Sequence, residues 1–236
     1  MPNGMQSGLG AGQRPPLRMA CFAAGTRIRT PSGLVAVDAL VPGDVATTVL
    51  GGPSAIVRWV GRRWADCRRH PRPLDVMPIC VRPGAFAPGA PAWNLYLSPD
   101  HAVYVDGMLV AIRDLENGHS IAQQDTESVT YFHVELDRHD IVLAEGLPVE
   151  SYLDRGDRAL FSNGGQVVTF GPSMVAAPSA TWPCAPSLAS GPVLEALWQR
   201  LSDRADEIVT ASRPRPNAAP PDSAMSRRGG RPPAHG

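Results

Sequence analysis

Residues 21–30 read Cys21-Phe22-Ala23-Ala24-Gly25-Thr26-Arg27-Ile28-Arg29-Thr30. Apolar and polar side chains alternate in this stretch, and short apolar-rich runs return at residues 34–37, 45–50, 55–59, 95–105, 128–136 and 141–144. The first runs are separated by the turn-forming segments Pro31-Ser32-Gly33, Pro42-Gly43-Asp44 and Gly51-Gly52. Alternation with a period of two, interrupted by turn signals every roughly 8 to 12 residues, is typical of all-β domains. The sequence therefore predicts an all-β body.

Cys21 is also a candidate nucleophile, because its own amide nitrogen belongs to the Ala20–Cys21 peptide bond. Its sulfur can attack the Ala20 carbonyl through a five-membered ring, which replaces the peptide bond by a thioester. An amide is planar and its nitrogen leaves poorly, so the bond must be twisted and the nitrogen protonated. A free cysteine is a few per cent thiolate at neutral pH and the attack is intramolecular, so we expect Cys21 to need only modest activation.

His101 is the candidate acid for the departing nitrogen. It ends the segment Leu97-Ser98-Pro99-Asp100-His101, and imidazole titrates close enough to neutrality to hold and release a proton in one turnover. The alternative is that Ser98-Pro99-Asp100 is simply a turn that leads into a strand at residues 102–105, with His101 as a structural residue. Cys21 makes the functional interpretation the stronger one.

These motifs resemble the hedgehog/intein (Hint) family, and in particular a bacterial branch in which the domain stands without an obvious host enzyme. The resemblance covers roughly residues 19–165 and implies a horseshoe of short antiparallel strands with pseudo-twofold symmetry. It implies the catalytic set Cys21, His101, Ser98, His139 and His133, with Ser98 where the family usually has threonine and with His139 weighted above His133. In this family the domain cleaves or splices its own chain.

The segment Gly146-Leu147-Pro148-Val149 is followed by Glu150-Ser151, whereas inteins that splice end in His-Asn. Neither side chain can form the succinimide that cuts the second bond, so we expect autoproteolysis without splicing. The substrate would be the N-terminal flank, and the acceptor of the thioester would be water or a small thiol. Two alternatives stay open: an inactive Hint scaffold that binds or displays, which the short flank of 20 residues favours, and a cysteine hydrolase that acts on other proteins.

Composition argues against several partners. Twenty-two basic residues, all arginine, balance twenty-two acidic ones, so there is no electrostatic footprint for nucleic acid or for an anionic membrane. The absence of lysine is typical of a GC-rich bacterial coding bias. The four cysteines lack Cys-x-x-Cys spacing, so we expect no metal, no cofactor and no disulfide framework. Without a signal peptide or an apolar span, the expectation is a monomeric, soluble, cytoplasmic protein.

The remaining segments are predicted from composition. Residues 1–18 are expected to be a disordered leader and residues 166–191 a linker rich in proline, alanine and serine, with one possible strand at 167–170. Residues 192–211 show apolar side chains at helical spacing, Trp198 among them, and are expected to form an amphipathic helix that docks on the domain. Residues 212–236 are expected to be a disordered tail. Cys67, in an arginine-rich stretch, is expected in a solvated loop with a lowered pKa.

Overall fold

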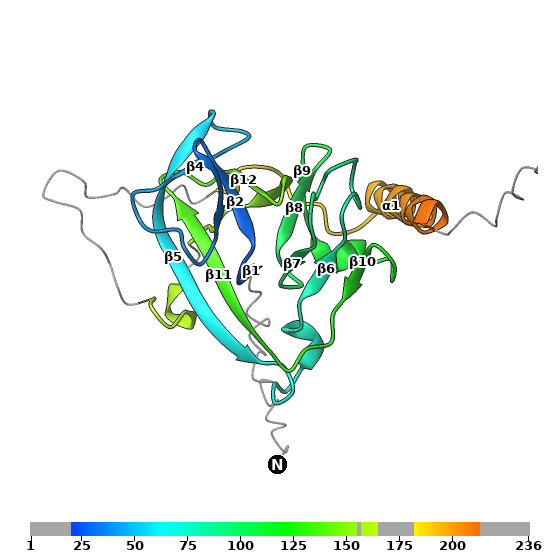
Figure 1. Cartoon of the computed structure of the whole chain (residues 1–236), viewed down its shortest axis with the longest axis horizontal. Helices are drawn as coiled ribbons and strands as arrows, with labels where there is room; N and C mark the ends of the chain where they lie inside the picture. The colour runs from blue at the N-terminus through cyan, green and yellow to red at the C-terminus, as the bar shows by residue number, and fades with distance from the viewer. Residues whose placement is uncertain (1–19, 155–156, 165–181, 213–236) are drawn as a thin grey trace, which may run out of the picture.

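The computed structural model describes residues 20–154, 157–164 and 182–212. Short strands dominate this part of the chain, as the alternation predicts, and one α-helix follows them (Figure 1). The strands are β1 Phe22–Ala23, β2 Arg27–Thr30, β3 Gly33–Ala36, β4 Val45–Thr47, β5 Ser54–Asp66, β6 Ile79–Val81, β7 Leu95–Leu97, β8 Ala102–Val105, β9 Met108–Ala111, β10 Ile121–Gln123, β11 Ser128–Leu136, β12 Ile141–Ala144 and β13 Leu147–Glu150. The short 3₁₀ turns are η1 Pro73–Asp75, η2 Ile112–Leu115 and η3 Arg158–Leu160, and the helix is α1 Pro192–Ser212.

The strands form two antiparallel sheets. Their orders are β10-β6-β7-β1-β11-β5-β4 and β3-β2-β12-β13-β8-β9. The longest pairing joins β5 to β11 and runs along one whole side of the molecule (Figure 1). β1 lies between β7 and β11, with Phe22 opposite both Leu97 and Phe132. This insertion places Cys21, the residue before β1, in the interior of the first sheet.

Alternation along β1 sends neighbouring side chains into different clusters. Phe22 is fully buried in the main core, which both sheets share. Cys21 lies on the other side of the strand, in a smaller aromatic cluster completed by Ala23, Trp59, Tyr131, Tyr152 and Phe161. Successive side chains of a strand point to opposite faces, and burial of one large apolar side chain stabilises the fold by about 1.5–3 kcal/mol. The two clusters therefore fix the position of Cys21 from both sides.

The helix forms where the sequence predicts it and docks on the sheet edge beside β6 and β10 (Figure 1). Leu197, Leu201 and Ala205 are buried at its contact face. Trp198 was predicted in the same apolar stripe, but its side chain is 39% exposed and donates a hydrogen bond from Nε1 to the Glu116 carbonyl. An indole can satisfy its N–H at the rim of an interface while part of its ring stays wet, so Trp198 lies at the edge of the docked face.

Part of the predicted linker is packed on the domain. Residues 182–191, called the strap below, lie along β9: the Leu109 amide donates to the Pro186 carbonyl at 2.8 Å and the Leu188 amide donates to the Leu109 carbonyl at 2.9 Å. Ala185 is buried. Composition alone did not reveal these contacts, because the strap uses backbone groups rather than an apolar pattern. The predicted leader, the possible strand at 167–170 and the tail from residue 213 lie outside the described residues.

The prediction for Cys67 was wrong. Residues 62–66 continue β5, and Cys67 is fully buried where that strand ends. Burial raises the pKa of Cys67, and the nearby Asp66 and Asp125 raise it further. Arg68 pairs with Glu127 and Arg69 with Asp66, so the arginines do not lower the pKa of the buried thiol.

Gly61 is tightly packed within the β5–β11 pair. It lies opposite His133, and an added Cβ would overlap the Trp59 ring and approach Phe161 Cδ1 at 2.7 Å. We predict that Gly61→Ala lowers the free energy of unfolding by about 1–3 kcal/mol, because the aromatic cluster must move to make room. Arg62→Ala, an exposed change in the same strand, is the control and should cost no more than about 0.5 kcal/mol. Urea unfolding measures both; equal effects would contradict the packing described here.

Candidate active site

Cys21 and Ser98 form a reciprocal pair of hydrogen bonds. The Cys21 amide donates to Ser98 Oγ at 2.7 Å, and the Ser98 amide donates to the Cys21 carbonyl at 2.9 Å. The Cys21 amide nitrogen is the atom that would leave if the Ala20–Cys21 bond were cut. A serine hydroxyl can both accept and donate, and Ser98 Oγ, which accepts here, lies directly beside that nitrogen. Sequence analysis gave this position to His101.

His101 lies three residues further on, fully buried, at the end of a turn closed by its amide and the Ser98 carbonyl. Its Nε2 is 3.0 Å from the Glu150 carbonyl oxygen. A carbonyl only accepts, so this contact assigns the ring proton to Nε2 and leaves a lone pair on Nδ1. Nδ1 has no hydrogen-bond partner among the described residues. The 98–101 segment is therefore a turn, as one of the two interpretations expected, and the catalytic role of His101 stays a prediction.

Burial lowers the pKa of His101, while the backbone carbonyls of Glu150 and Cys21 oppose the shift. The net direction is down, so the neutral imidazole predominates at neutral pH. A neutral His101 cannot begin a reaction as an acid. It can accept a proton at Nδ1 first and deliver it afterwards.

The Cys21 thiol differs from the expectation of modest activation. It is fully buried, and burial raises its pKa far above the ordinary value. Arg63 lowers the pKa and Asp157 raises it, both by smaller amounts. Desolvation disfavours the charged thiolate. The sulfur is therefore held as a neutral thiol, and its attack on a carbonyl requires a base that removes the proton.

His133 lies closer to this centre than its low weight in the sequence analysis suggested. It is 3% exposed, and its ring centroid is 5.1 Å from that of His101 and 5.0 Å from that of Tyr152. Burial, together with the proximity of His101 and His139, holds its pKa well below the usual range. Its Nδ1 has no hydrogen-bond partner within the described residues. His133 is thus a second neutral imidazole with a lone pair.

His139 makes a different set of contacts. Its Nδ1 accepts the Cys184 amide proton at 2.9 Å, and its Nε2 is 3.2 Å from both the Ser151 carbonyl oxygen and Glu150 Oε1. Both ring nitrogens are therefore engaged, and they tie the strap to the end of β13. These contacts make His139 a positioning residue. The catalytic role that the resemblance implies for it stays a prediction.

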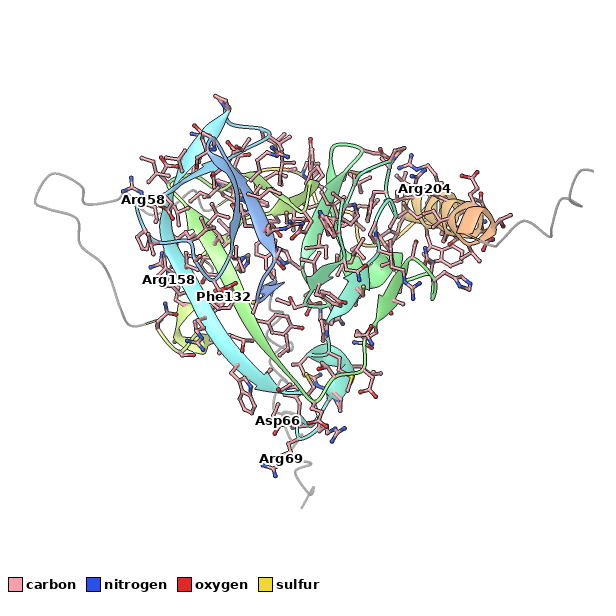
Figure 2. All side chains as sticks on the ribbon, viewed as in Figure 1. Arg58, Asp66, Arg69, Phe132, Arg158 and Arg204 are labelled. Atoms are coloured by element: carbon pink, nitrogen blue, oxygen red, sulfur yellow. The ribbon has the colours of Figure 1, made fainter. Side chains whose placement is uncertain are left out.

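Sequence reasoning missed several residues that surround the site. Tyr152 contacts the His133 ring and donates a hydrogen bond from its hydroxyl to Asp157, and Arg158, labelled in Figure 2 beside the β5–β11 pair, pairs with Glu135 and stacks on Trp59 at 5.0 Å. Tyrosine and arginine at these positions carry no local motif, so no sequence signal could have singled them out. Among the described residues, no group of three His, Cys, Asp or Glu side chains could hold a metal ion, and no helix is long and apolar enough to cross a membrane.

We predict that His133 makes stability depend on pH. Its pKa is 6.5 before folding and well below that in the fold, so the unfolded chain binds the extra proton and stability falls as pH drops below about 6.5. Between about pH 7.5 and pH 5.5 the native chain should lose about 1 kcal/mol more unfolding free energy than His133→Gln. His119→Gln, which removes an exposed imidazole, should keep the native dependence. Urea unfolding at both pH values tests this, and a His133→Gln slope equal to the native slope would contradict it.

Similar solved structures include an intein-like domain from Clostridium thermocellum (19% identity, TM-score 0.42, 57% of this chain and 99% of that chain). They also include a DnaB intein from Synechocystis sp. (10% identity, TM-score 0.40, 57% and 99%) and the MchDnaB-1 intein (14%, 0.38, 56% and 99%). No curated protein matches the sequence. The sequence model of the Hint domain matches residues 20–156, which is more than half of the chain, and the protein therefore belongs to the Hint domain family.

Proposed function

We propose that this Hint domain cuts its own chain at Ala20–Cys21 by an N-to-S acyl shift, and that hydrolysis or transfer of the resulting thioester completes the cleavage. The observation that carries the proposal is the 2.7 Å hydrogen bond between the Cys21 amide nitrogen and Ser98 Oγ. It holds the bond to be broken against a hydroxyl that can supply a proton. Hint domains generally process their own flanks, which agrees with this assignment.

The buried groups suggest an order of proton transfers. The neutral Nδ1 of His101 accepts the Cys21 thiol proton while the sulfur forms its bond to the Ala20 carbonyl carbon. The carbon–nitrogen bond then breaks as the nitrogen takes up a proton from Ser98 Oγ, which the protonated His101 replenishes. The products are a thioester at Ala20 and a free amine on Cys21. Each step moves a proton between groups that burial keeps neutral, so no isolated charge has to persist in the cluster.

The pathway is proposed to stop at the thioester. The chain has no asparagine between Asn117 and Asn163, so no succinimide can form near the end of β13. There the Glu150 carbonyl faces His101 Nε2, and Ser151 Oγ accepts the Asp140 amide proton at 3.0 Å. We propose that Glu150 and Ser151 stabilise the fold through these hydrogen bonds and take no part in a second cleavage. An external nucleophile such as water or a small thiol must therefore open the thioester.

One observation favours the alternative of an inactive scaffold. The Cys21 thiol is fully buried with a strongly raised pKa, as expected of a structural cysteine. The same burial argues against a hydrolase that acts on other proteins, because an external peptide could not reach the sulfur. Self-cleavage needs no such access, since Ala20 is the covalent neighbour of Cys21.

We predict that the full chain, incubated with dithiothreitol at neutral pH, releases residues 1–20. Cys21→Ala should abolish the release because it removes the nucleophile, and His101→Gln should slow it by about 100-fold or more because it removes the proton carrier. Ser98→Thr, which keeps the hydroxyl, should retain activity, whereas Ser98→Ala should not. Intact mass spectrometry over time measures all four variants.

Cys80→Ala is the matched control, since it removes another buried thiol that lies outside the site. It should release residues 1–20 at the native rate. An unchanged mass for the native chain after prolonged incubation favours the scaffold. Cleavage of an added unrelated polypeptide, with the mass of the chain itself unaltered, favours the hydrolase.

A further inference from the structure

A pocket of about 240 Å³ opens next to the bond that the proposed function cuts. Ala20, whose carbonyl would carry the thioester, and His133 both line it. Tyr152, Leu153 and Phe161 form part of the same wall. A molecule in this pocket would therefore contact the acyl group and a buried imidazole together.

The strap supplies another wall of the pocket through Ser187, Leu188 and Ala189. It lies beyond residues 20–156, where the match to the Hint family ends. Its hydrogen bonds to both backbone groups of Leu109, and that of the Cys184 amide to His139, hold it in place. The strap and the matched domain therefore form the pocket together.

The pocket is acidic. Four carboxylate residues line it and no arginine does: Asp100, Asp114, Glu150 and Asp157. Asp100 pairs with Arg113 at 3.1 Å and Glu150 lies 3.2 Å from His139, both partners being outside the pocket. Asp157 accepts a hydrogen bond from the Tyr152 hydroxyl in the pocket wall, and Asp114 also has an interaction of its own. The charge of Asp157 also reaches Cys21 and contributes to raising its pKa. A cation is favoured here, and an anion is repelled.

His133 provides an independent indication of a ligand. Its imidazole is 97% buried, as its 3% exposure implies, it lines the pocket, and its Nδ1 lacks a hydrogen-bond partner among the described residues. A buried polar atom without a partner is costly, and a bound group with an N–H or O–H would satisfy it. The carboxylates and this imidazole thus line the same pocket.

We propose that this pocket is the acceptor site of the thioester and that its acceptor is a primary alkylamine, bound first as the ammonium ion. The inference rests on the proposed function and names the class of its second substrate. The ammonium loses one proton to solvent, and its nitrogen attacks the Ala20 carbonyl carbon while the neutral imidazole of His133 takes a second proton. The new carbon–nitrogen bond forms as the bond to Cys21 Sγ breaks, and the sulfur receives the proton from His133. The products are an N-terminal segment that ends in an alkylamide and a chain that begins at Cys21.

Two amines of similar size and basicity test the charge preference. The full chain is incubated separately with n-propylamine and with β-alanine at equal concentration. Mass spectrometry then identifies the released segment of residues 1–20 as the amide or as the free acid. We expect about tenfold more adduct with n-propylamine, because the carboxylate of β-alanine faces the acidic wall. Equal adduct formation from both amines overturns the inference.

Ala189→Arg adds a cation at the exposed rim of the pocket, where it disturbs no core packing. It should remove most of the preference for n-propylamine, whereas Ala196→Arg, the same change on an exposed face of α1, should preserve it. A preference that survives Ala189→Arg unchanged places the selectivity elsewhere and overturns the inference. Release of residues 1–20 by dithiothreitol is measured in parallel: release without amine selectivity overturns this inference alone, and no release overturns the proposed function with it.

Discussion

The two hydrogen bonds between Cys21 and Ser98 hold the site together. They attach the residue before β1 to the end of β7, while β1 itself pairs with β11 on its other side. The Ala20–Cys21 amide is thereby fixed inside the molecule, with its nitrogen against a hydroxyl. In an intramolecular reaction this fixed geometry can replace much of the activation that a free thiol would need.

Burial then determines the character of the chemistry. Cys21, His101 and His133 are each buried, and burial shifts the pKa of each in the direction that favours the neutral form. Neighbouring neutral donors and acceptors can exchange protons without creating an ion that the interior must stabilise. The same desolvation makes an idle thiol stable, so one arrangement is compatible with both a working centre and a silent scaffold.

The sequence predicted the features that depend on local pattern. The alternation at residues 128–136 and 141–144 matches β11 and β12, and the spacing after Pro192 matches α1. Features set by tertiary contacts could not be predicted. The pKa of Cys21 depends on burial by strands distant in sequence, His133 gains its place through its register with Gly61, and the strap docks through backbone hydrogen bonds. Cys67 shows the converse, because burial and the carboxylates of Asp66 and Asp125, rather than the arginines near it in sequence, decide the direction of its pKa.

Trapping with hydroxylamine tests the central claim most directly, because this nucleophile converts a thioester into a stable hydroxamate. The full chain is incubated with hydroxylamine at neutral pH, and both fragments are identified by tandem mass spectrometry. The account predicts one fragment that ends in an Ala20 hydroxamate and another that begins with Cys21 bearing a free amine and a free thiol. An Ala20–Cys21 bond that stays intact would contradict it; cuts at Asn-Gly bonds, which hydroxylamine makes in any protein, do not count.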